Sequence, residues 1–205
     1  MKKQTLVNLL TLPFMITALT ACSPHKDKKV SQTNKTTMTE TKKAEHQDVR
    51  ANFEKIKLAT AASEFKGGTN LEELTTLFGQ PSQHTKKTAG NVILDSYTWK
   101  FDQVTVSVSL YENNSIVKTI SNFAFLRDLN LSQKDYQKLQ KGMSYEDVKK
   151  LLTEPDNYSQ ASSSNGQTLQ AIWISGLKTE TDNANISLVF ENNQLTEMSQ
   201  VGLEK

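Results

Sequence analysis

The sequence predicts an α+β protein made of two tandem repeats, each with two helices followed by a three- to four-stranded antiparallel sheet. Residues 142–155, GMSYEDVKKLLTEP, align without a gap with residues 68–81, GTNLEELTTLFGQP, at an offset of 74 residues. The tripeptide ENN then recurs at 112–114 and 191–193, at an offset of 79, which implies five inserted residues in the second copy. Two copies of this length indicate a duplicated small domain rather than a solenoid.

The first helix of each repeat is expected before the repeated stretch. In residues 51–65, ANFEKIKLATAASEF, apolar side chains recur at helical spacing between Glu and Lys. The shorter counterpart, LSQKDYQKLQKGM at 131–143, offers Ser132 as N-cap and Asp135 three residues later. Glycines at the start of each repeated stretch are expected to end these helices.

The repeated stretch itself predicts a capped two-turn helix. Asn70 and Ser144 are good N-caps, and acids follow three residues later at Glu73 and Asp147. One apolar stripe runs along each helix. The prolines that close both stretches prevent continuation.

After each closing proline the apolar period changes to two. The clearest case is VTVSVSLY, residues 104–111, in which Val and Leu alternate with Ser, Thr and Tyr as in a half-buried strand. The ENN tripeptides are predicted hairpin turns. The other expected strands lie within 82–88, 92–101, 115–126, 157–163, 168–177, 185–190 and 194–201.

The N-terminus predicts export and lipidation. Two lysines precede a broken apolar run in residues 1–21, a signal-peptide pattern too short for a stable membrane span. The sequence LTAC, ending at Cys22, resembles the bacterial lipobox, and the chain contains only 1 cysteine. We therefore expect Cys22 to be the lipidated first residue of the mature protein, which leaves no disulfide or thiol chemistry for the folded part. The alternative is an ordinary secretory signal.

The segment from Cys22 to about residue 50 is predicted to be a disordered tether. It contains almost no apolar residues, and residues 23–50 carry 7 basic against 4 acidic side chains. From residue 51 onward the chain has 15 basic and 18 acidic residues, so a basic patch for nucleic acid is not expected. The expected domains are repeat 1 at 51–128 and repeat 2 at 129–205.

The pattern GMSYEDVxxLLxxP, a short helix before it and a meander with an aromatic residue after it resemble the SmpA/OmlA/BamE-type module. Its duplication is similar to the β-lactamase inhibitory protein and to Gram-positive lipoproteins that share its fold. The resemblance covers residues 52–203 and identifies a fold rather than an activity. It implies that an enzyme or another protein binds on the concave, aromatic-bearing face of the joined sheets and their loops.

On that resemblance, the partner-binding residues on the open sheet face would be Trp99, Trp173, Tyr97, Tyr111 and Phe190. Trp and Tyr are enriched in binding hot spots. The alternative for the two tryptophans is that they pack the sheet against a helix or the other repeat. The alternation along the strand does not say which face they occupy.

The sequence predicts a protein that is not an enzyme and needs no cofactor. The paired acids Glu72/Glu73 and Glu146/Asp147 lie in first helical turns, where they complement the helix dipole. The three histidines lack partners at metal-ligand spacing, and no G-x-S-x-G motif is present.

We thus expect a lipid-anchored protein on the outer face of the cell membrane that binds an envelope or extracellular protein. The alternatives are an inhibitor of a secreted or envelope hydrolase (a β-lactamase-like or wall enzyme), a binder of small ligands or wall polymer, and a structural assembly factor.

Overall fold

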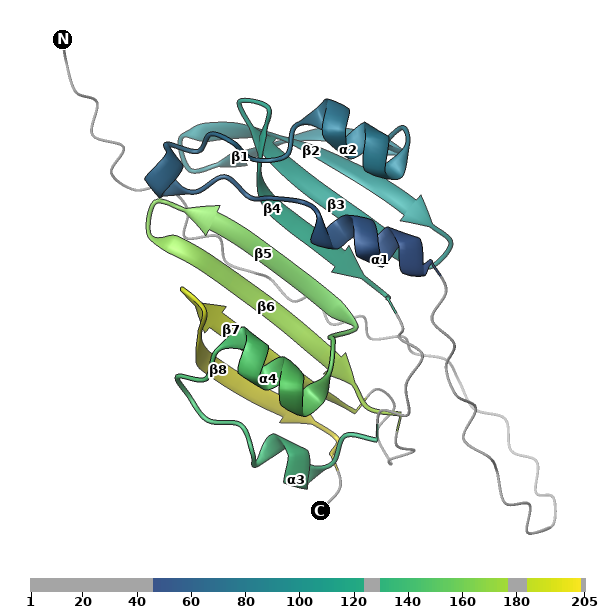
Figure 1. Ribbon diagram of the computed structural model, residues 1–205, viewed down its shortest axis with the longest axis vertical. Helices are drawn as coiled ribbons and strands as arrows, with labels where there is room; N and C mark the ends of the chain where they lie inside the picture. Colours follow the sequence, from purple (N-terminus) through teal and green to yellow (C-terminus); the bar gives the residue numbers. More distant parts are fainter. Residues whose placement is uncertain (1–45, 124–129, 177–183, 204–205) are drawn as a thin grey trace, which may run out of the picture.

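One antiparallel sheet of eight strands organises the protein, and the strands lie side by side in chain order from β1 to β8 (Figure 1). The computed structural model describes residues 46–123, 130–176 and 184–203. The strands are β1 (Gln83–Ala89), β2 (Val92–Phe101), β3 (Val104–Tyr111), β4 (Asn114–Ser121), β5 (Asn157–Ser163), β6 (Gly166–Ile174), β7 (Asn185–Glu191) and β8 (Gln194–Val201). The helices are α1 (Gln47–Glu54), the 3-10 helix η1 (Ala61–Ser63), α2 (Leu71–Phe78), α3 (Gln133–Tyr136) and α4 (Tyr145–Leu152).

The expected division into two repeats, each with its own helix pair and its own sheet, is wrong. Strand β4 pairs with β5 between Val117↔Ala161 and Ile120↔Tyr158, so the eight strands form one continuous sheet. A single buried cluster runs beneath the helices from Val49 to Leu203. Two separate four-stranded sheets would each expose two edge strands, and pairing β4 with β5 removes two of those four edges.

The first expected helix is also shorter and earlier than its apolar spacing indicated. Helix α1 ends at Glu54, and the next residues run extended because their backbone bonds to other segments. The Lys57 amide donates to the Thr69 hydroxyl at 2.9 Å, and the Ala59 amide donates to the Ser115 carbonyl at 2.8 Å. The start of α1 at Gln47 places the last residues of the predicted tether in the folded part, where Arg50 is buried.

The repeated stretches do form capped helices. The Asn70 side chain accepts from the Glu73 amide at 3.0 Å, and the Glu73 carboxylate accepts from the Asn70 amide at 2.8 Å. In α4, the Ser144 hydroxyl accepts from the Asp147 amide at 3.1 Å. Each cap satisfies backbone donors that a helix start leaves unpaired.

Both helices are held to the sheet by the same two contacts. At the start, the Asn113 side chain accepts from the amide of Leu71 at 3.2 Å, and Asn193 accepts from the amide of Tyr145 at 3.1 Å. At the end, the Trp99 indole donates to the Gly79 carbonyl at 2.9 Å and the Trp173 indole donates to the Thr153 carbonyl at 3.0 Å. The hairpin turns and the two tryptophans therefore position α2 and α4.

These contacts also correct the alignment of the hairpin turns. Turn residues Glu112 and Asn113 have φ of 46° and 60°, and Asn192 and Asn193 have 48° and 65°. The equivalent asparagines are thus 80 residues apart (193 − 113), one more than the offset of 79 from the ENN match. The correction matters because an alignment that is wrong by one residue assigns the side chains of a strand to the opposite face of the sheet.

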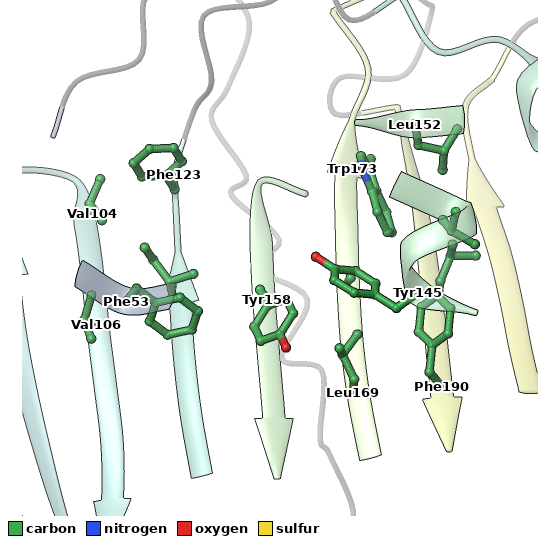
Figure 2. Packing of buried hydrophobic residues seen from close by; sticks show 14 of the residues in the cluster. Phe53, Val104, Val106, Phe123, Tyr145, Leu152, Tyr158, Leu169, Trp173 and Phe190 are labelled. Atoms are coloured by element: carbon green, nitrogen blue, oxygen red, sulfur yellow. The ribbon is translucent and has the colours of Figure 1, made fainter. Parts of the chain in front are cut away.

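Helix α1 joins the two halves of the sheet. Tyr158 of β5 lies between Phe53 of α1 and Tyr145 of α4, with ring centroids 5.6 Å from each (Figure 2). Arg50 binds both Glu54 and Glu154 at 2.8 Å.

Beside Phe53, the buried Lys118 amine donates to the Ile56 carbonyl at 3.1 Å, and burial lowers its pKa.

Candidate protein-binding face

The sheet has one face covered by helices and one that we call the open face. Strand β3 alternates strictly between buried residues, such as Val106 and Val108, and half-buried ones, such as Ser107 and Ser109. Trp99 of β2 pairs with Val106, and Val106 pairs with Ile120 of β4, so one buried row crosses these strands beneath the helices. Helices α1, α2 and α4 lie on this side, over the main buried cluster (Figure 1).

Small hydroxyl side chains dominate the open face over β2 to β5. Ser96 and Ser109 lie 2.7 Å apart between their hydroxyl oxygens, and Thr119 and Ser159 lie 2.8 Å apart. The pair of Thr98 and Ser107 is at 3.1 Å. The middle row of the face, in register across all eight strands, is Gln83, Thr98, Ser107, Thr119, Ser159, Gln170, Val189 and Glu197.

The open face has the dimensions of a protein interface. Eight strands about 4.8 Å apart, with three rows of side chains along each, cover about 35 Å by 20 Å, or roughly 700 Å². A standard interface buries about 800 Å² on each partner. The face can therefore contact another protein over a usual area.

Charge is distributed unequally over this face. The exposed Lys87 and Lys100 lie on β1 and β2, and the exposed Glu191 and Glu197 lie on β7 and β8. The hydroxyl pairs between them carry no charge. The face is therefore positive at one end and negative at the other.

One corner of the open face is closed by the segment before α2. Ala89 and Leu94 point to this face and are buried with Ala59 of that segment. The Phe65 ring packs edge-on against Tyr111, with centroids 6.2 Å apart. Ser96 is buried as well, so the accessible part of β2 on this face begins at Thr98.

Three of the five predicted partner-binding residues lie in the core instead. Trp99, Trp173 and Phe190 are 2%, 0% and 1% exposed, and each belongs to the cluster under the helices. The prediction that they line the open face is wrong for this fold, because an indole that donates to a helix-end carbonyl must point toward that helix.

The other two predicted residues are partly accessible but lie on opposite faces. Tyr97 is on the helix side of β2, where its ring stacks on His84 at 4.4 Å; burial and then the charge of Asp95 raise its pKa. Tyr111 is the only one of the five on the open face, and burial and then Glu112 raise its pKa. The structure does not bring the five residues together.

Sequence reasoning missed the hydroxyl pairs. The signal was present as the Thr and Ser positions that alternate with valines in 104–111, and they were predicted as the polar side of a strand. What identifies them as one surface is the register of Thr98 with Ser107 and of Thr119 with Ser159 across neighbouring strands.

A hollow of about 440 Å³ in the described part, near Lys57, Glu73 and Asn113, is a candidate small-ligand site. It is open and polar, and the side chains of Glu73 and Asn113 already bind the start of α2.

In the described ranges no group of three His, Cys, Asp or Glu side chains could hold a metal ion. Among the helices described, none is long and apolar enough to cross a membrane. Cys22 and the predicted signal peptide lie outside the described residues.

Comparison with known proteins gives a matching family and a similar solved structure. Residues 45–203 match the family described as "Domain of Unknown Function with solved-structure structure (DUF3862)". No curated protein matches the chain. A similar solved structure is a Streptococcus mutans protein described as a "putative beta-lactamase inhibitor protein". It is 41% identical, the match covers 79% of this chain and 100% of that one, and the TM-score is 0.71. The expected likeness to β-lactamase inhibitory proteins is thus confirmed, and the likeness to the BamE-type module stays a prediction.

Proposed function

This chain belongs to the DUF3862 family, and from that premise we propose that it is a non-catalytic protein that binds, and inhibits, a secreted or cell-envelope hydrolase. The observation that carries the proposal is the open face, about 700 Å² of mainly polar side chains, of which the segment before α2 covers one corner. The similarity to the Streptococcus mutans protein supports an enzyme as the partner class.

The geometry favours a protein over a small ligand as the partner. A small molecule needs a concave pocket with convergent polar groups. The row from Thr98 to Gln170 is instead an extended surface on a rigid sheet, and its hydroxyls are held by their cross-strand partners. A surface with fixed side chains loses little conformational entropy when a partner covers it.

We also propose that Cys22 carries a lipid anchor on the outer face of the cell membrane, which would place the binding face near membrane-proximal enzymes. The support is the signal-peptide pattern of residues 1–21 and the lipobox-like LTAC. Mass spectrometry of the mature protein should find a diacylated Cys22, and Cys22→Ser should release the protein into the medium. An unmodified Cys22 in mature protein would contradict the anchor.

The inhibition proposal is tested with the full chain purified in detergent. We would measure the hydrolysis rates of a class A β-lactamase, a lysozyme and a wall amidase with increasing amounts of the protein. The expected result is stoichiometric loss of activity of one enzyme. The variant Thr119→Arg, which places a bulky cation on β4 in the middle of the open face, should abolish this inhibition.

The matched control is Thr76→Arg on the exposed side of α2, which makes the same chemical change on the other side of the molecule. It should inhibit like the natural sequence. If Thr76→Arg and Thr119→Arg inhibit equally well, the open face is not the binding surface. If none of the three enzymes is bound or slowed, the proposed function is wrong for these classes.

A further inference from the structure

The open face changes its chemistry between the two halves of the sheet. Over β2 to β5 it presents paired hydroxyls, whereas over β6 to β8 it presents four branched apolar side chains among polar ones. The register places Ile172 opposite Ser187, and Asn185 opposite both Ile174 and Val201. We call the following four residues the apolar quarter of the open face: Ile172, Ile174, Val189 and Val201.

The apolar quarter is not part of the core. None of its four residues belongs to either buried cluster, and all remain partly accessible. Val201 is 53% exposed, one of the most exposed large apolar side chains in the described part. Apolar groups on a sheet face lose accessible area when a partner covers them, which favours association.

The two kinds of surface would contribute differently to binding. Hydroxyls such as those of Thr119 and Ser159 already bond to each other and to water, so a partner exchanges hydrogen bonds with little net gain. Covering Ile172 or Val189 removes apolar area from water without such an exchange. The centre of a protein interface is its most apolar part, with a polar rim around it. The interface should therefore be centred on β6 to β8.

Charge beside the apolar quarter indicates what the partner carries there. Glu197 lies opposite Val189 in the register, and Glu191 lies two residues further along β7. Both carboxylates are exposed, and the exposed lysines of this face are on β1 and β2 at the other end. A partner that matches this distribution has a basic residue beside an apolar one over β6 to β8, and an acidic residue over β1 and β2.

We propose that the apolar quarter is the anchor of the binding face and that it accepts an apolar side chain flanked by Lys or Arg on the partner enzyme. This inference rests on the proposed function and names the chemistry of its partner. It also gives the complex one orientation, because turning the partner end for end would place like charges opposite each other at Lys87 and at Glu197.

The test compares two variants on the same face, with binding measured by surface plasmon resonance against the enzyme that the full chain inhibits. The double variant Ile172→Thr with Val189→Thr gives β6 and β7 the chemistry of the first half and should raise Kd by about tenfold or more. The matched variant Thr98→Val makes the reverse change on β2 and should alter Kd by less than about threefold. Glu197→Lys should slow association most at low salt.

The outcomes separate the inference from the proposed function. If the double variant keeps the natural Kd while Thr119→Arg abolishes binding, the face binds an enzyme but is not anchored by the apolar quarter. Faster association of Glu197→Lys would contradict a basic partner. If sedimentation shows a dimer that the double variant dissociates, the occupant is a second copy of the chain and the inference fails. If no enzyme binds the natural sequence, the proposed function and the inference fail together.

Discussion

Gly79 is the C-cap of α2 in the first half of the molecule, and Thr153 is the C-cap of α4 in the second, yet both residues have the same backbone conformation. Their φ and ψ are 78° and −163° for Gly79, and 67° and −159° for Thr153. Both carbonyls accept from a buried tryptophan. Thr153, a β-branched residue, thus adopts in the second half the backbone conformation that Gly79 adopts without strain in the first.

The two halves share the contacts that hold a helix and differ in what they present on the open face. Asn113 and Asn193 bind the helix starts in the same way, but the open face carries paired hydroxyls in one half and branched apolar side chains among polar ones in the other. The comparison shows that the internal repeat describes how the helices dock on the sheet, whereas the open face has no internal symmetry.

The largest expected effect tests whether the two tryptophans have the same role. Trp99→Ala and Trp173→Ala should each lower the free energy of unfolding by about 3–5 kcal/mol, because each empties a buried site and leaves a helix-end carbonyl without its donor. Urea denaturation of the full chain measures this loss. A loss below about 1 kcal/mol in one half only would show that the two docking sites are not equivalent.

The tyrosines predict a difference between the halves at alkaline pH. Burial, followed by the charge of Glu154 for Tyr145 and of Glu54 for Tyr158, raises the pKa of both groups well above the usual value of 10.0. A raised folded-state pKa gives stability that is complete below pH 10 and is lost as the pH rises. The loss should be about 1.4 kcal/mol per pH unit for each tyrosine.

Absorbance and circular dichroism, followed together during an alkaline titration, check this expectation. Tyr145 and Tyr158 should ionise only as the protein unfolds, whereas Tyr97 and Tyr111 in the first half should ionise earlier. Tyr158→Phe should make the free energy of unfolding less dependent on pH above 10. Ionisation of all tyrosines before any loss of structure would contradict the burial of Tyr145 and Tyr158.

Exchanging the residues at the two helix ends should change stability in opposite directions. Thr153→Gly should raise the free energy of unfolding by about 1 kcal/mol, because glycine relieves the backbone strain. The gain is smaller than the whole strain because glycine also has more freedom in the unfolded chain. Gly79→Thr should lower it by about 1–3 kcal/mol. No atom lies within 4 Å of a Cβ built on Gly79, so the cost comes from the backbone. Destabilisation by Thr153→Gly would mean that contacts of the threonine side chain outweigh its strain.

The smallest expected effect concerns the turn asparagines. Asn113→Ala and Asn193→Ala should each lower the free energy of unfolding by about 1 kcal/mol, because the first amide of a helix loses its acceptor. The paired variants Asn113→Gly and Asn193→Gly keep the positive φ at lower strain, so the remaining loss measures the hydrogen bond itself. Thermal denaturation resolves both differences. Equal stability of the glycine variants and the natural sequence would remove the proposed role of these side chains.

Much of the local structure could be predicted from particular residues. The caps at Asn70 and Ser144, the turn near Asn113 and the alternation of 104–111 are set by interactions within a few residues, and the structure contains all of them. The candidate site was less predictable. Trp99 and Phe190 were expected to be exposed because aromatic residues favour interfaces, but the same side chains are also the largest available to fill a core.

By itself, the sequence determined where α2, α4 and β3 begin and end, since capping, turn formation and side-chain alternation depend on near neighbours. Only the tertiary structure decided that β4 pairs with β5, which face of the strands lies under the helices, and that Asn193 rather than Asn192 corresponds to Asn113. These choices depend on contacts between residues far apart in the chain. An alternating strand fits a core with either face until a partner strand and a helix are placed against it.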